Sequence, residues 1–180
     1  MKIRMIIGCV LTLLTASGQL QAGSHVYQTP DEFVAETFAG SPPGAQALWI
    51  KPDLRAQLGA VLGRKPGLRM RYWGDTKRTV WVLDEIGKDQ PITAGVVIND
   101  GAIEDIRVLV FRESRGWEVK YPFFTRQFLD ARLEQQDLSN QIDGITGATL
   151  SVRAMKRMAR AALLLHEHTV AATNTLAKAR

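Results

Sequence analysis

Hydrophobic and polar residues alternate with a period of two through the middle of the chain. Four segments combine this alternation with β-branched and aromatic residues: 68–73, 79–83, 92–98 and 103–111. Turn-forming residues, Gly74-Asp75 and Asn99-Asp100-Gly101, stand between neighbouring segments. Because short turns join adjacent antiparallel strands, the pattern predicts an antiparallel meander of four strands.

Two amphipathic helices are predicted before the meander, in an N-terminal helical segment that covers residues 23–66. Thr29 is a cap residue that precedes Pro30 and two acidic residues, so a helix should run from there to about Phe38. Residues 51–63 have leucine and valine at helical spacing, which predicts the second helix.

The chain after the meander predicts a helix over 122–133, a polar loop over 134–144 and a long helix over 151–166. Residues 169–180 contain only two large apolar side chains, so they are expected to form a flexible tail. Together the elements predict an α+β fold, in which an antiparallel sheet of about four or more strands is packed by helices in a single domain.

The N-terminus has the three parts of a secretory signal. Lys2 and Arg4 precede the apolar stretch 5–16, and small and polar residues follow as far as Ala22. A stretch of about a dozen apolar residues is shorter than the roughly 20 needed to span a bilayer. We therefore expect a signal peptide over residues 1–22, cleavage after Ala22 and a periplasmic protein, which would be anchored in the membrane if the signal stayed uncleaved. His25, close to the cleavage site, is expected in a disordered tail.

Composition is that of an ordinary globular domain. The chain has 180 residues, of which 46% are hydrophobic and 23% are charged. The formal net charge is +5, but the basic residues are scattered, so no nucleic-acid partner is expected. The single cysteine, Cys9, lies in the expected signal peptide, which excludes disulfide, C-x-x-C and thiolate-zinc chemistry in the mature chain. His166 and His168 would point about 200° apart on a helix, so no metal site is expected.

Small and hydroxyl residues gather immediately before the long C-terminal helix, in the segment Asp143-Gly144-Ile145-Thr146-Gly147-Ala148-Thr149. A helix N-terminus presents free backbone N–H groups and a positive dipole end, which favour phosphate. The glycines and Ala148 keep side-chain bulk away from the Thr149 hydroxyl. Alternatively, Thr149 or Ser151 only caps the helix.

This segment resembles the D-x-x-[ST]-G-A-[ST] flavinylation motif of FMN-binding domains, which occur in flavin-carrying subunits of the sodium-pumping NADH:quinone oxidoreductase and of Rnf-type complexes. Every specified position matches. In that family a flavin transferase joins the FMN phosphate to the hydroxyl of the last motif residue, which corresponds to Thr149. The resemblance implies an FMN-binding domain over residues 67–168, with Asp143, Thr146, Gly147 and Ala148 around the attachment site.

A second stretch, Glu113-Ser114-Arg115-Gly116, is similar to the E-T-P-G segment of these domains, although Ser114 and Arg115 depart from the commonest residues. Glu113 and Gly116 are therefore further candidates for cofactor binding. Aromatic residues that could stack on a flavin ring follow closely: Trp117, Tyr121, Phe123 and Phe124. Arg115 and Lys120 could lie near the phosphate or the reduced ring.

Asp143 has two candidate roles. Its carboxylate could serve as a base during attachment, because a threonine hydroxyl is a poor nucleophile, or it could orient the loop as an Asx turn, which we favour. No catalytic residue, Rossmann or P-loop motif, or nucleophile elbow is recognised.

These expectations combine into an exported flavoprotein that carries FMN on Thr149 and relays electrons. The expected partners are the flavin transferase and membrane or extracytoplasmic redox proteins; the oligomeric state is left open. Two alternatives remain: a non-redox binding module whose Thr149 loop is only a helix cap, and a flavin-dependent reductase of an extracellular acceptor.

Overall fold

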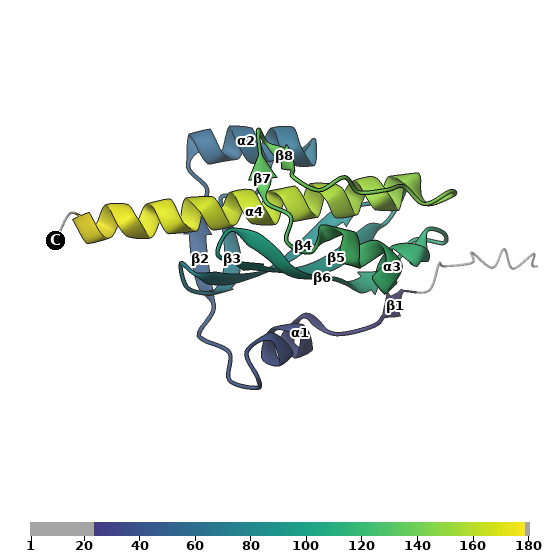
Figure 1. Ribbon diagram of the computed structural model, residues 1–180, viewed down its shortest axis with the longest axis horizontal. Helices are drawn as coiled ribbons and strands as arrows, with labels where there is room; N and C mark the ends of the chain where they lie inside the picture. The colour runs from purple at the N-terminus through teal and green to yellow at the C-terminus, as the bar shows by residue number, and fades with distance from the viewer. Residues whose placement is uncertain (1–23, 179–180) are drawn as a thin grey trace, which may run out of the picture.

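A six-stranded antiparallel sheet forms the centre of the protein (Figure 1). The structure, a computed structural model, describes residues 24–178. Four strands form the predicted meander: β3 (Arg69–Gly74), β4 (Arg78–Ile86), β5 (Pro91–Asn99) and β6 (Ala102–Phe111). The meander and the α+β class are thus confirmed.

Two short edge strands complete the sheet, and the sequence pattern did not predict them. β1 (His25–Val26) pairs with the end of β6, where His25 lies opposite Phe111. β2 (Gln46–Trp49) pairs with β3 at the opposite edge, so the order is β1-β6-β5-β4-β3-β2. His25 is therefore part of the sheet, and its expected place in a disordered tail is wrong.

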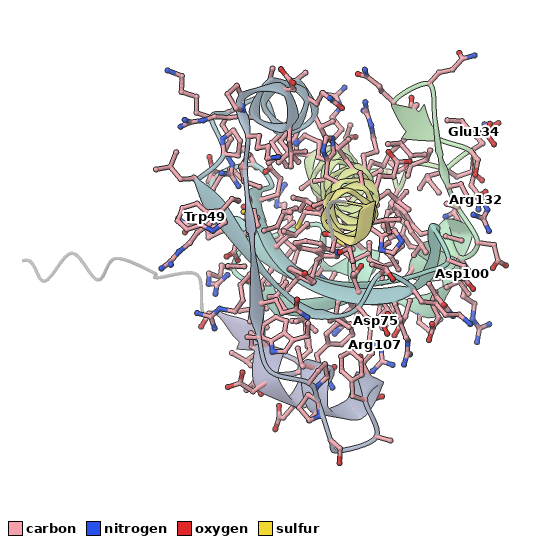
Figure 2. All side chains as sticks on the ribbon, turned by 90° about the vertical axis from the view of Figure 1, so that its left-hand side faces the viewer. Trp49, Asp75, Asp100, Arg107, Arg132 and Glu134 are labelled. Carbon is pink, nitrogen blue, oxygen red and sulfur yellow. The ribbon has the colours of Figure 1, made fainter. Side chains whose placement is uncertain are left out.

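Helices cover both faces of the sheet. The long helix α4 (Thr149–Lys178) and the helix α2 (Pro52–Leu62) lie on one face, and α1 (Pro30–Thr37) lies on the other (Figure 1). Seen along α4, the helix α2 and the small hairpin of β7 (Leu133–Glu134) and β8 (Asp137–Leu138) flank it on its two sides (Figure 2). This layering explains why β5 is buried along almost its whole length, whereas an open sheet face would leave alternate residues exposed.

The helix α1 sits directly on the sheet because Gly95 has no side chain. A Cβ atom at Gly95 would collide with the Phe33 ring, which is fully buried. Phe33 packs in a small cluster with Val34, Val80 and Val97. On the other face the main core includes Trp81 and the buried side of α4. The absence of a side chain at Gly95 thus allows α1 to cover the face of the sheet opposite α4.

The predicted helix over 122–133 is broken into short pieces. These are α3 (Pro122–Thr125) and the 3-10 turn η2 (Arg126–Phe128); another 3-10 turn, η1 (Trp117–Lys120), precedes them. The backbone then leaves the helical path: Asp130 has a φ of 62°, its N–H donates to the Ile103 carbonyl (2.8 Å), and the Ile103 N–H donates to Ala131 (2.9 Å). This pairing with the start of β6 is incompatible with a continuing helix.

The C-terminal helix is longer than predicted and continues to Lys178. Thr169 is buried and donates its hydroxyl hydrogen bond to the Leu165 carbonyl, while His168 and Ala172 face α2 and β2 across a hollow. The burial of Thr169 and the contacts of α4 with α2, together with the high helix propensity of alanine, support a helix in a segment that has few large apolar residues. The predicted flexibility of residues 169–180 stays a prediction.

The expected signal peptide, with Lys2, Arg4 and Cys9, lies outside the described residues. Within residues 24–178, no helix has the length and apolar character that crossing a bilayer requires.

Candidate functional site

The segment Asp143–Ser151 forms a turn followed by the first residues of α4. The Ala148 N–H donates to the Ile145 carbonyl (3.0 Å), which closes a four-residue turn. Gly147, at the third position, has a φ of 83°, as a type II turn requires. Apart from its two neighbours in the chain, no residue that the structure describes lies within 4 Å of a Cβ atom at Gly147, so the backbone conformation, rather than lack of space, demands glycine there.

Thr149 is the first residue of α4 and is exposed. Its hydroxyl has no hydrogen-bond partner within residues 24–178, and neither has that of Ser151, so the structure shows neither residue acting as a hydroxyl cap. The first N–H of the helix with an internal acceptor is that of Val152, which donates to Ala148 (2.9 Å). The three preceding N–H groups have no acceptor in the described chain and are available to an anion at Thr149.

Two amide side chains fix the loop that leads to this turn. Gln127 accepts a hydrogen bond at Oε1 from the Asp143 N–H (2.7 Å). Asn140 donates from Nδ2 to the carbonyls of Gln127 (3.0 Å) and Leu129 (2.9 Å). Sequence reasoning missed both residues, because amides in a polar loop carry no periodic signal. The hydrogen bonds of Gln127 and Asn140 attach the loop to η2, so residues distant in the sequence fix the position of the turn before Thr149.

Asp143 does not form the Asx turn that we favoured from the sequence. Its carboxylate is exposed and accepts no hydrogen bond in the part of the chain that the structure describes. The loop is held instead through the Asp143 backbone and Gln127. The carboxylate therefore remains open to solvent and to an approaching protein. Thr146, on the same turn, is also exposed.

Gly116 brings the second sequence segment into contact with the first. A Cβ atom at Gly116 would lie 2.5 Å from Ser151 Oγ and 3.4 Å from the Ala148 Cβ atom. Gly116 also has a φ of 85°, which L side chains rarely adopt. Two independent features therefore favour glycine at position 116: the positive φ angle and the close packing against the start of α4. The two stretches that the sequence singled out meet here.

Glu113 has a structural partner that its sequence context did not reveal. Its side chain is buried, and Oε1 accepts hydrogen bonds from the backbone N–H groups of Lys88, Asp89 (2.7 Å) and Gln90 (2.9 Å). Gly87 allows this approach, since a Cβ atom there would lie 2.8 Å from the same oxygen. Glu113 therefore organises the loop between β4 and β5 at the edge of the site.

A hollow of about 360 Å³ opens beside the contact of Gly116 with α4. The residues that line it come from β1 and the position after it, from the end of β6, from the loop that follows β6, and from η1. They are His25, Tyr27, Phe111, Glu113, Ser114, Trp117 and Lys120. Tyr121 stands next to it, with its ring edge-on to that of Trp117 at 5.6 Å. This volume lies in the range of about 300–1,000 Å³ typical of small-molecule sites. A half-exposed aromatic wall of this kind suits a flat, largely apolar ring.

The other candidate aromatics divide between core and surface. Phe124 is fully buried and packs edge-on against Phe128 at 5.3 Å, so it is a core residue and cannot stack on a ligand. Phe123 is 61% exposed beside Tyr121. Arg115 is exposed and does not line the hollow, whereas Lys120 does.

A second hollow of about 310 Å³ lies near the other end of α4, and Trp49 at the sheet edge lines it (Figure 2). His168 and Leu54 also line it. It is distant in the fold from the turn before Thr149, and its lining is largely apolar. His166 lies apart as well: it is buried, and its Nδ1 is bonded to the Thr79 hydroxyl (2.9 Å). Within residues 24–178, no cluster of three potential metal ligands occurs.

Comparison with known proteins identifies the region that contains this site. Residues 87–164 match the family model of the FMN-binding domain. The match covers both the Glu113–Gly116 stretch and the segment Asp143–Thr149. The chain therefore contains an FMN-binding domain, and FMN is its cofactor. No curated protein matches the chain.

Proposed function

We propose that this chain, through its FMN-binding domain, carries FMN in a phosphodiester bond to Thr149 and acts outside the cytoplasm as an electron-transfer relay. The observation that supports the proposal best is the state of Thr149. Its hydroxyl is exposed and free of hydrogen bonds in the described chain, at a helix end with three N–H groups available to a phosphate. A helix cap would instead use that hydroxyl internally.

Attachment requires an exposed hydroxyl, a leaving group and a base. Thr149 Oγ1 forms a bond to the phosphorus of an activated FMN ester while the bond from that phosphorus to its leaving group breaks. The hydroxyl proton passes to a base. The free Asp143 carboxylate, six residues earlier in the chain, is the candidate for this role, acting together with a flavin transferase as partner.

The chain's own residues supply orientation and control of solvent. When bound, FMN supplies the redox chemistry. The α4 N-terminus neutralises the phosphate, and the aromatic hollow beside Gly116 receives the ring. Phe123 and Leu150 leave apolar surface exposed around the site, which gives a redox partner a place to dock. A covalent link keeps one flavin on each chain in a compartment where free FMN would be diluted.

The intact mass of the exported protein tests this proposal. The wild-type chain, produced with a periplasmic flavin transferase, should gain the mass of one FMN phosphodiester, and Thr149→Ser should retain part of it. Thr149→Ala should lose it, because the hydroxyl that forms the bond is removed. Full labelling of Thr149→Ala would place the link elsewhere.

The relay function needs a second measurement on the labelled protein. Dithionite should reduce the attached flavin, and ferricyanide should reoxidise it rapidly and reversibly. A flavin that is attached but cannot be cycled in this way would contradict electron transfer while leaving the attachment intact.

A further inference from the structure

Lys120 is held by aromatic rings instead of a carboxylate. Its Nζ atom lies 4.1 Å from the centre of the Tyr27 ring, 5.1 Å from that of Tyr121 and 5.5 Å from that of Trp117. Each ring presents its negative face to a nearby cation, and such contacts are favourable when they are partly shielded from water. Lys120 thus occupies a cage of three rings, in the wall of the 360 Å³ hollow.

The carboxylates that line the two hollows beside Lys120 are engaged elsewhere. Glu36 borders a neighbouring hollow that Lys120 also lines, but it accepts hydrogen bonds from Arg107 (2.8 Å) and Gln28 (2.7 Å). The Arg107 hydrogen bond is the main reason that the pKa of Glu36 is lowered from its ordinary value. Glu113 binds the backbone of the β4–β5 loop. In the described chain Lys120 forms no ion pair, so its charge is available to a ligand in the hollow.

The third ring of the cage comes from the N-terminal segment, outside the region that matches the FMN-binding domain family. Pairing of β1 with β6 fixes this segment, and the N–H groups of Tyr27 (2.9 Å) and Gln28 (3.3 Å) both donate to the Leu109 carbonyl. The ring of His25 stacks on that of Tyr27, with centres 6.3 Å apart. The backbone of the sheet thus holds Tyr27 against Lys120.

We infer that Tyr27 and Lys120 form one wall of the flavin-ring site, and that Lys120 is the cation that stabilises the reduced flavin; this inference rests on the proposed function. Uptake of two electrons from a reductant and one proton from water leaves one negative charge on the ring. A cation in the wall lowers the free energy of that reduced form relative to the neutral oxidised form. Lys120 therefore raises the reduction potential, and Tyr27 positions it.

Potentiometry of the FMN-loaded protein tests the assignment. Lys120→Gln should make the equilibrium constant for reduction about tenfold smaller, which for a two-electron couple is about 30 mV. Arg115→Gln is the matched control, because Arg115 is also an unpaired cation in the same stretch but does not line the hollow; its potential should equal that of the wild type. Tyr27→Ala should shift the potential in the same direction as Lys120→Gln, and Tyr27→Phe, which keeps the ring, should not.

The outcomes separate this inference from the proposed function. Intact mass must first show that each variant still carries flavin on Thr149. If flavin is attached and cycles but Lys120→Gln leaves the potential unchanged, the ring site is elsewhere and the inference is overturned, although the proposed function stands. Equal shifts in the Arg115→Gln and Lys120→Gln proteins would also overturn it, because they would indicate a general charge effect. Absence of flavin from wild-type Thr149 overturns both.

Discussion

Replacing Gly116 with alanine should destabilise the domain more than the same change at Gly144 or Gly147, the two glycines of the segment Asp143–Thr149. At Gly116 the new methyl group would meet Ser151 Oγ at 2.5 Å, and the backbone φ is 85°. A left-handed conformation costs an alanine about 1–2 kcal/mol, and an extra methyl group in a packed contact costs about 1–3 kcal/mol. The expected loss in the free energy of unfolding is therefore roughly 2–5 kcal/mol.

Two other glycines separate the two causes. Gly147 has a φ of 83° but open space around its Cβ position, so Gly147→Ala should cost only the conformational part, about 1–2 kcal/mol. Gly144 has neither a positive φ nor a close neighbour, so Gly144→Ala should stay within about 0.5 kcal/mol of the wild type.

Urea denaturation of the flavin-free proteins measures these free energies without a contribution from bound ligand. The order Gly116, then Gly147, then Gly144 is the result that the geometry requires. Equal losses at Gly116 and Gly147 would refute the close packing of Gly116 against Ser151, and with it the contact that joins the two sequence stretches.

Two further predictions concern buried titratable groups. Glu113→Ala should leave three backbone N–H groups of the β4–β5 loop without an acceptor, at a cost of about 1–3 kcal/mol, and should speed hydrogen exchange at residues 88–90; unchanged exchange there would contradict the role of Glu113. Burial lowers the pKa of His166 from its ordinary 6.5, although Asp100 and Asp75 partly oppose the shift, so the unfolded chain binds this proton more readily. The free energy of unfolding should therefore decrease as the pH drops below about 6.5, and it should decrease less steeply in His166→Gln. Urea denaturation between pH 5 and 8 measures this dependence. If the free energy of unfolding had the same pH dependence in both proteins, the assignment to His166 would be contradicted.

The elements that the sequence predicted correctly are those defined by local signals. Alternation of side chains and turn residues within a few positions was sufficient for the meander. A cap residue with Pro30 was sufficient for α1, at whose start the structure also shows a capping box between Thr29 and Glu32. β1 and β2 have two and four residues, too few for a periodic signal. Their strand character comes from partners far along the chain, such as Phe111 for His25.

Tertiary contacts explain the incorrect helix boundaries. Between residues 122 and 133 the apolar spacing favours a helix, but backbone pairing of Asp130 and Ala131 with Ile103 overrides it. At the C-terminus the opposite occurs, because packing of α4 against α2 extends a helix whose own sequence contains few large apolar residues. Neither effect is visible in a window of neighbouring residues.

The candidate site divides in the same way between local and distant contributions. The turn before Thr149, where we propose that FMN is attached, is encoded by consecutive residues, and a motif can identify it. The proposed ring site depends on segments that are far apart in the chain, since Tyr27 follows β1 and Lys120 lies in η1. The match to the FMN-binding domain covers Lys120 and Gly116 but not Tyr27. Proteins that share the turn can therefore attach the same flavin and still differ in its potential, because the residues that surround the ring are chosen by the rest of the fold.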